Sequence, residues 1–331
     1  MSPTATSKPD SKQWWNYSAI NTLENIMHAD TGDTERGQNL ARFYQQTQGN
    51  LIKAAESIAS KESPVARIIT GFYIEKMGAA ETDGISSAVQ MAYFFKLAGI
   101  ECNITTDKYC AAICRAALAE VGCADMLEVV EAPDDKTVEE HLKKWNHQQV
   151  THVISIERPG PSLSDNRPYN MKGELIENCY PLHRLFSRGN WQKIGIVDRG
   201  NEIGSGSLPA YMIAEDIYNG EQIACKTGAD YLLVARVSNW AANALTAAIA
   251  ILGPNEWPNH LRQALNDNLQ ENILKTMAKS GAVDGITYAR RPNRPTVDAL
   301  PMSKHTEMVK ALLDTTGHAV GGRGMLKLSV A

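Results

Sequence analysis

The sequence lacks the features that mark membrane and exported proteins. No apolar run is long enough to cross a bilayer; the longest candidate, residues 241–252, is short and rich in alanine and predicts a buried helix. The N-terminus has neither the apolar core of a signal peptide nor the Arg-rich amphipathic pattern of a transit peptide. We therefore expect no membrane partner and a cytoplasmic location.

The chain also has no excess of positive charge and few cysteines. Lys and Arg number 33 against 37 Asp and Glu, giving a net charge of -4, and the basic residues are scattered along the chain. A nucleic-acid partner normally requires a basic patch, so we expect none. The six cysteines form no CxxC pair and no zinc-ligand spacing, which predicts buried, reduced thiols.

Several catalytic and nucleotide-binding motifs are missing as well. The chain contains no P-loop, nucleophile elbow, HExxH motif or kinase signature. Gly204 and Gly206 follow an expected strand, but the third glycine of the dinucleotide fingerprint is absent. The sequence therefore gives no reason to expect NAD.

The composition that remains is that of a globular protein. Of the 331 residues, 43% are hydrophobic and 21% are charged, which suits a large buried core. Residues 1–15 are polar with Pro, Ser and Thr and predict a mobile tail. No shift in composition divides residues 16–331, so we expect a single domain there.

Strands and helices are expected to alternate along most of the chain. Helical patterns cover residues 35–60, 85–98, 109–121, 138–145 and 179–186 and continue from 239; strand patterns cover 66–74, 100–105, 126–130, 151–156, 193–197 and 231–237. This alternation predicts an α/β fold of the Rossmann-like three-layer kind, a mostly parallel sheet with helices on both faces. After residue 253 we expect a helical C-terminal extension, interrupted by a surface loop at 289–301.

Acidic residues gather in the loops that follow three expected strands. These residues are Glu81 and Asp83, then Glu157, then Asp198 and Glu202. Ligands of open parallel sheets bind at the carboxyl ends of strands, and converging carboxylates are typically held together by a hard cation. We therefore expect a divalent metal, Mn²⁺ or Mg²⁺, with four ligands: Glu81, Asp83, Glu157 and Asp198. Two alternatives stay open, since Asp83 could instead cap a helix and Glu157 and Asp198 could pair with the adjoining Arg158 and Arg199.

Other polar residues near these loops have competing interpretations. Gly200, with Gly204 and Gly206, could let backbone N–H groups approach an anion. Ser238 or Asn239 is a natural N-cap for the following helix, whose N-terminus could also receive a carboxylate; the cap is favoured. His152 is expected in the core, and His183 lies near the expected site.

Six stretches of this sequence resemble the D-glutamate cyclase family. They are GFYI with ETDG (residues 71–84), IERPGP (156–161), YNMKG (169–173), PLHRLF, IGIVDRGNEIGSG and VSNW, within a similarity that covers roughly residues 30–252. The family tends to have glycine where this chain has Val197 and Arg199, and aspartate where it has His183. Arg199 could therefore narrow the pocket or contact an anion.

The resemblance implies a lyase that dehydrates D-glutamate, an acidic amino acid, to 5-oxo-D-proline. Under this reading the metal polarises the side-chain carboxyl group, and Asp198 or Glu202 takes and returns a proton. The substrate carboxylate would be held by four sites: Arg158, Asn201 and the amides around Gly200 and Asn239. The competing functions are a metal-dependent phosphoester hydrolase and a non-catalytic amino-acid or metal sensor. Assembly into a homo-oligomer is left open.

Overall fold

The main sheet is six-stranded and wholly parallel. The computed structural model describes residues 11–29 and 39–328. The strands of the sheet are β1 (Val65–Thr70), β4 (Glu101–Asp107), β5 (Leu127–Val130), β6 (His152–Ile156), β7 (Gln192–Val197) and β8 (Tyr231–Val234). Their order is β5-β4-β1-β6-β7-β8, and each neighbouring pair is parallel. The expected three-layer α/β fold is confirmed.

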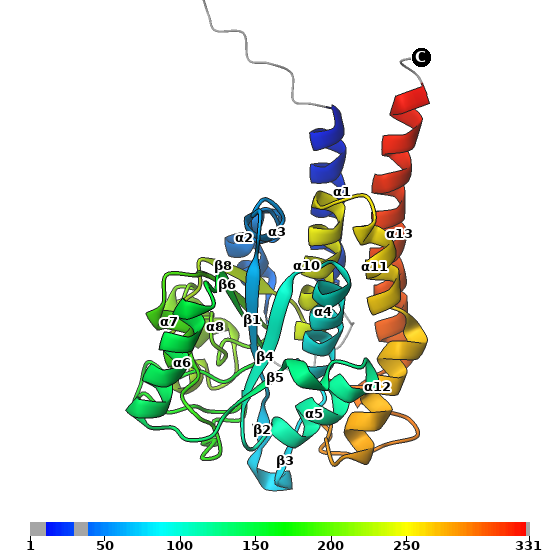
Figure 1. Ribbon diagram of the computed structural model, residues 1–331. Helices are drawn as coiled ribbons and strands as arrows, with labels where there is room; N and C mark the ends of the chain where they lie inside the picture. Colours follow the sequence, from blue (N-terminus) through cyan, green and yellow to red (C-terminus); the bar gives the residue numbers. More distant parts are fainter. Residues whose placement is uncertain (1–10, 30–38, 329–331) are drawn as a thin grey trace, which may run out of the picture.

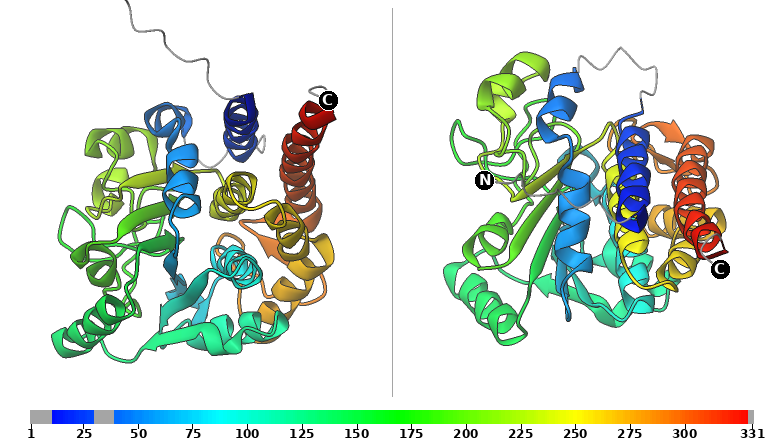
Figure 2. Two further views of the ribbon diagram at one scale, coloured as in Figure 1. Left: turned by 45° about the horizontal axis from the view of Figure 1, so that its top comes forward. Right: turned by 90° about the horizontal axis from the view of Figure 1, so that it is seen from above.

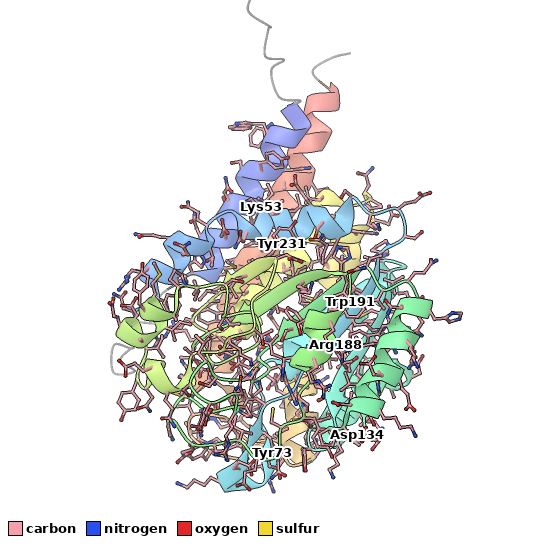
Figure 3. The ribbon with its side chains drawn as sticks, turned by 90° about the vertical axis from the view of Figure 1, so that its left-hand side faces the viewer. Lys53, Tyr73, Asp134, Arg188, Trp191 and Tyr231 are labelled. Atoms are coloured by element: carbon pink, nitrogen blue, oxygen red, sulfur yellow. The ribbon has the colours of Figure 1, made fainter. Side chains whose placement is uncertain are left out.

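The strand order places a crevice beside the central strand. From β1 the chain first builds β4 and β5 on one side and then returns to build β6, β7 and β8 on the other. The loops that leave β1 and β6 therefore run in opposite directions and leave room for a ligand between them. Figure 3 shows the polarity: Tyr231 opens β8 near the top, whereas Tyr73 and Asp134 follow β1 and β5 near the bottom.

Helices cover both faces because buried strand residues alternate between two apolar cores. On β1, Ile68 joins the core beneath one helical layer and Ile69 joins the core beneath the other. The first layer contains α3 (Asn50–Ala59), α4 (Ile85–Leu97), α5 (Ala111–Glu120) and α10 (Ser238–Leu252). The opposite layer contains α2 (Ala41–Thr47), α6 (Asp135–His147), α7 (His183–Arg188), α8 (Ala210–Asp216) and α9 (Gly220–Ile223) (Figure 1).

A further shell of helices covers α10, α4 and α5. It consists of α1 (Ser11–Met27), α11 (Trp257–Ala264), α12 (Asp267–Lys279) and α13 (Met302–Leu328). Figure 2 shows α1 and α13 standing beside α10, although the two lie at opposite ends of the sequence. Burial on every side explains the alanine-rich composition of α10, since small side chains let neighbouring helices approach. Among the described residues, no helix is long and apolar enough to cross a membrane.

Two short hairpins and two 3₁₀ turns complete the fold. β2 (Tyr73–Ile74) pairs with β3 (Ala79–Ala80) around the turn η1 (Glu75–Met77), β9 (Thr296–Val297) pairs with β10 (Leu300–Pro301), and η2 (Ala124–Met126) precedes β5. The expected strand 66–74 is therefore wrong beyond Thr70. The break falls at Gly71, where φ is +109° and an added Cβ would lie 2.7 Å from the Thr106 hydroxyl.

Some other expected boundaries differ. The expected helix 35–60 is two helices, α2 and α3, because Gly49 adopts a φ of +80° between them; residues 35–38 lie outside the described residues. The expected helix 179–186 begins only at His183, since Pro181 disfavours a helical conformation in the residue before it. Of the expected tail, residues 1–10 lie outside the described residues and 11–15 belong to α1.

Candidate active site

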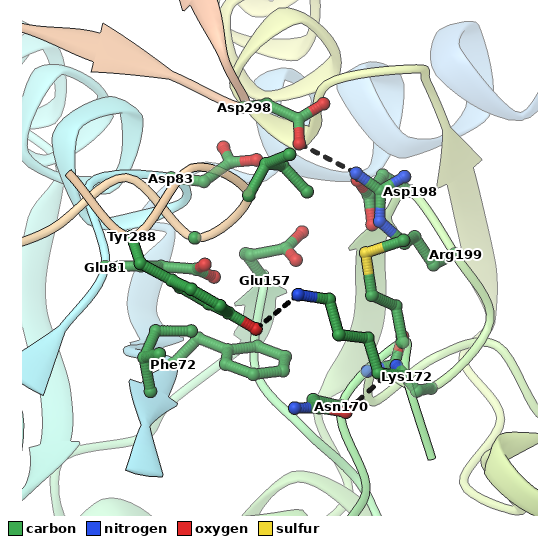
Figure 4. Close-up of a pocket in the computed structure, with 15 residues that line it drawn as sticks. Phe72, Glu81, Asp83, Glu157, Asn170, Lys172, Asp198, Arg199, Tyr288 and Asp298 are labelled. Atoms are coloured by element: carbon green, nitrogen blue, oxygen red, sulfur yellow. Dashed lines mark hydrogen bonds and ion pairs between the residues drawn. The ribbon is translucent and has the colours of Figure 1, made fainter. Parts of the chain in front are cut away.

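An acidic pocket lies at the carboxyl edge of the sheet, beside β1, β6 and β7. It is a small cavity of about 40 Å³, which is room for a few water molecules. Five carboxylates line it: Glu81, Asp83, Glu157, Asp198 and Asp298. Each of these residues is at most 7% exposed. Figure 4 shows their side chains converging on the pocket from separate elements.

Two strand ends and the start of one helix place three of these carboxylates. Glu157 follows β6 directly, Asp198 follows β7 directly, and Asp83 precedes α4. Glu81 extends β3 and forms a bridge with Val283 from the C-terminal part of the chain. The expected four metal-ligand candidates, Glu81, Asp83, Glu157 and Asp198, therefore line one pocket.

The C-terminal part supplies the fifth carboxylate and closes the pocket. Asp298 and Ala299 form the two-residue turn between β9 and β10, with φ values of +52° and +62°. The Asp284 carboxylate holds this turn by accepting the Ala299 amide at 2.9 Å. The expectation of a surface loop at 289–301 is therefore wrong for Val297 and Asp298, which are buried.

The backbone is strained where it carries pocket residues. Glu157, Tyr288 and Asp298 all line the pocket with φ between +45° and +58°. Residues other than glycine pay for this conformation, so it persists where the surrounding structure enforces it, often at functional sites. Glycine is required at two positions next to the acids: an added Cβ at Gly84 would collide with Glu157, and one at Gly285 would collide with the Glu81 carboxylate.

Burial and mutual repulsion weaken the acidity of the cluster. Burial, followed by the charge of neighbouring carboxylates, raises the pKa of Glu81 and of Glu157 well above the usual range. Burial and then the charge of Asp298 raise the pKa of Asp83 to about 7. Burial also raises the pKa of Asp198, although Arg199 opposes the shift. A bound cation would relieve both penalties.

Among the described residues, two trios of acids bring oxygens within 4.8 Å of one another. One trio is Asp83, Asp198 and Asp298, and the other is Glu157, Asp198 and Glu202. Asp198 belongs to both, and its buried Oδ1 has no hydrogen-bond partner. Its Oδ2 lies 3.2 Å from an Arg199 nitrogen, so the alternative of pairing with the adjoining arginine holds for Asp198. Glu81 lines the pocket but belongs to neither trio.

Glu202 does not have the geometry of the expected proton carrier. It is fully buried, does not line the pocket, and accepts hydrogen bonds from the amides of Asp198, Arg199 and Gly200. The Ser205 hydroxyl donates a fourth bond. These donors stabilise the turn after β7, so Glu202 positions Asp198. The amide of Gly200 is therefore occupied and does not face a substrate.

Of the expected substrate-binding residues, Arg158 lies outside the pocket and Asn201 lines it. Arg158 is not in the pocket; it pairs with Asp107 at 2.5 Å and donates to the carbonyls of Gly71 and Tyr180. The alternative pairing of Glu157 with Arg158 is therefore not observed. Asn201 does line the pocket: its Nδ2 donates to the Tyr169 carbonyl, and its buried Oδ1 has no partner.

The side chains of Ser238 and Asn239 do not cap α10, whose N-cap is Val237. They form hydrogen bonds to residues of other elements instead. Asn239 Oδ1 accepts the amide of Gly84 and the hydroxyl of Ser87, so it holds the start of α4. Ser238 donates to the Glu157 carboxylate. The N-cap expectation is thus wrong, and Asn239 is not among the residues that line the pocket.

The remaining expectations concern caps, histidines and cysteines. Gly84 is the N-cap of α4, and Asp83 Oδ1 accepts its amide at 2.8 Å.

Burial lowers the pKa of both His152 and His183 to about 4. His152 is a core residue, as expected, and His183 does not line the pocket. All six cysteines are free, and all but Cys179 are buried.

The pocket residues without a role assigned from the sequence include Lys172, Tyr288 and Asp298. Lys172 belongs to the YNMKG stretch, and its Nζ donates to the Tyr288 hydroxyl at 2.6 Å. The only available signal for Lys172 was its motif. Tyr288 and Asp298 lie far along the chain, beyond the motifs, and reach the pocket because the segment at Val283 pairs with Glu81.

Comparisons with known proteins bear on the family of the chain. A protein named D-glutamate cyclase, mitochondrial, from Homo sapiens is 25% identical over 334 aligned residues, which cover 90% of this chain and 52% of the human protein. The chain thus spans about half the length of the curated relative that it matches. A family model described as D-glutamate cyclase-like, C-terminal, matches residues 23–313. Because that match covers most of the chain, including the whole main sheet, the chain belongs to the D-glutamate cyclase-like C-terminal domain family.

Proposed function

We propose that the chain is a lyase that dehydrates D-glutamate to 5-oxo-D-proline in the acidic pocket. The observation that carries the proposal is the buried, unpartnered Oδ1 of Asp198 among four further carboxylates in that pocket. The family adds support, although the name of the human relative belongs to a protein about twice as long as the matched region. Substrate, reaction and stereochemistry are therefore parts of the proposal.

A divalent Mn²⁺ or Mg²⁺ fits the residues that are present. Asp83, Asp198 and Asp298 would hold it, with Glu81 and Glu157 nearby, and all five offer the oxygen ligands that hard cations prefer. The unpartnered Asp198 Oδ1 is the orphaned atom that such an ion would satisfy. When bound, the ion would polarise the side-chain carboxyl group and stabilise the departing oxygen.

The acids of the pocket would handle the substrate amine. The α-nitrogen forms a bond to the side-chain carboxyl carbon, one carbon–oxygen bond breaks, and two protons of the ammonium group leave with the oxygen as water. Glu157 lines the pocket, whereas Glu202 is occupied by four donors and lies outside it. We therefore assign the transfer of these protons to Asp198 or Glu157, and the positioning of Asp198 to Glu202.

The test is to incubate the protein with D-glutamate or L-glutamate, with Mn²⁺, Mg²⁺ or a chelator, and follow loss of water by mass spectrometry. We expect metal-dependent, D-selective formation of 5-oxoproline. Asp198→Asn should lower the rate about 100- to 1,000-fold, since it removes one charged group from the site. Asp314→Asn, at an exposed ion pair on α13, is the matched control and should not change the rate.

The other outcomes distinguish the competing functions. If neither isomer yields 5-oxoproline with either metal, the cyclase proposal fails. Binding of D-glutamate without turnover would then indicate an amino-acid sensor. Metal-dependent release of phosphate from a model phosphoester would indicate the hydrolase.

A further inference from the structure

Arg199 lines the acidic pocket with one half of its guanidinium group unused. The residue is 4% exposed, and its Nη2 lies 2.7 Å from Asp298 Oδ1 and 3.2 Å from Asp198 Oδ2. Its Nη1 is buried and has no hydrogen-bond partner. Figure 4 shows the contact with Asp298 at the side of the pocket opposite Glu81.

The unused half of Arg199 is a charged donor. Burial opposes the charge, but the carboxylates of Asp198 and Asp298 outweigh it and hold the pKa of Arg199 above its usual value. A guanidinium group has five N–H donors and accepts no hydrogen bond, so a group that satisfies Nη1 must be an acceptor. The matching acceptor for a buried arginine is a carboxylate or another anion.

A second cation lines the same pocket. Lys172 Nζ donates to the Tyr288 hydroxyl and lies 4.2 Å from the centre of the Tyr288 ring. Figure 4 shows this contact at a different place in the pocket from the contact of Arg199 with Asp298. An ammonium group has three donors, and the bond to Tyr288 uses one of them. The pocket therefore presents two separate positive groups beside its acids.

We propose that Arg199 anchors one carboxylate of the substrate through Nη1 and that the pocket selects small molecules with two carboxylates, the second held by Lys172. This inference rests on the proposed function for the identity of the substrate, but it makes a claim about binding alone. In this proposal Arg199 selects the substrate, and Asp198 and Asp298 fix the orientation of the Arg199 guanidinium group.

Arg158, on the same edge of the sheet, shows how the guanidinium group of a buried arginine is hydrogen-bonded when it only supports the fold. Both terminal nitrogens of Arg158 have partners: Nη1 donates to the Gly71 carbonyl, and Nη2 contacts Asp107 and the Tyr180 carbonyl. Only its Nε is buried without a partner. A buried terminal nitrogen without a partner is thus particular to Arg199 in this pair of buried arginines.

The test measures binding by isothermal titration calorimetry with Mn²⁺ present. The probes are glutarate, which has two carboxylates and no amine, and its monoamide, which has one carboxylate. Wild-type protein should bind glutarate about 10- to 100-fold more tightly than the monoamide. Arg199→Gln should reduce this preference to within about threefold, mainly by weakening the binding of glutarate.

Two further variants separate lost binding from lost folding. Arg199→Gln combined with Asp298→Asn removes the cation together with one of its buried partners, and it should melt near the wild-type temperature while still lacking the preference. Arg199→Lys keeps the charge but lacks the second terminal nitrogen, and it should retain only part of the preference. Arg158 is not altered, because its contacts support the fold.

The outcomes separate this inference from the proposed function. If folded Arg199→Gln keeps the wild-type preference, or if wild-type protein does not prefer glutarate, the inference is overturned. If the preference depends on Arg199 but the wild-type protein makes no 5-oxoproline from D-glutamate, the inference stands and the cyclase proposal fails.

Discussion

Two buried acid–base clusters lie at the carboxyl edge of the same sheet, and their hydrogen bonding differs. Asp107, at the end of β4, accepts bonds from Arg158 and from the amides of Tyr109, Cys110 and Tyr180. At the end of β7, Asp198 pairs with Arg199, but Asp198 Oδ1 and Arg199 Nη1 are buried without partners.

This difference in hydrogen bonding indicates that the Asp107 cluster supports the fold and that the Asp198 cluster is suited to bind a ligand. Buried charges are normally paired and hydrogen-bonded, because an unsatisfied one costs free energy. The Asp107 cluster meets this rule almost completely. The Asp198 cluster, in contrast, contains buried polar atoms without hydrogen-bond partners and carboxylates with raised pKa values. Polar groups left unsatisfied in a pocket are the pattern expected of a binding site.

The largest effect should come from breaking the satisfied cluster. Asp107→Ala leaves the Arg158 charge buried without its partner, and we expect a loss of about 3–5 kcal/mol in the free energy of unfolding. Asp298→Ala should cost clearly less, because Arg199 keeps its contact with Asp198. Urea denaturation followed by circular dichroism measures both. Equal losses in the two variants would contradict the assignment of Asp107 to the fold and Asp298 to the site.

A cation should stabilise only the unsatisfied cluster. If the pocket binds Mn²⁺, an ion concentration 100 times the Kd should add about 2.7 kcal/mol to the stability of the folded state. Calorimetric melting with and without a chelator measures the shift. Asp198→Asn should abolish it, whereas the exposed control Asp314→Asn should retain it. A shift that survives in Asp198→Asn would place the ion elsewhere.

A smaller effect should appear in the pH dependence of metal-free protein. The pKa of Asp83 is about 7 in the folded chain, whereas the usual value is 3.8. The unfolded chain therefore loses the Asp83 proton at lower pH than the folded chain does. As a result, the free energy of unfolding falls as pH rises from about 4 to 7. Asp83→Asn should therefore gain about 1–3 kcal/mol at pH 8 and nothing at pH 4. Urea titrations across this range test it, and parallel pH profiles for the two proteins would refute it.

Much of the fold was readable from the sequence because local patterns determine it. The apolar β-branched runs and glycine helix ends gave six strands of the main sheet and the helices between them, with errors at boundaries. The strand beyond Thr70 and the single helix over 35–60 failed at Gly71 and Gly49, where a positive φ turns the chain. The residues around Gly71 continue the apolar strand pattern, and those around Gly49 continue the helical pattern. The sequence pattern therefore did not reveal either turn.

The candidate site was readable only in part. Glu157 and Asp198 directly follow strands of one parallel sheet, and Glu81 and Asp83 follow its strand β1 after a short hairpin. Parallel strands end on one edge, so the meeting of these acids in the pocket follows from the order of elements. The same reasoning placed Arg158 and Asn239 in the site, because position after a strand does not say which way a side chain points. The structure turns both into the scaffold.

By itself the sequence determined the α/β class, the edge of the sheet that carries the acids and the family. Only the tertiary structure decided which acids meet, that Glu202 is held by the turn after β7, and that Asp298 and Tyr288 enter from the C-terminal part of the chain. The physical reason is that periodicity and turn chemistry are local, whereas hydrogen-bond satisfaction and the pairing of Val283 with Glu81 join residues far apart in the chain.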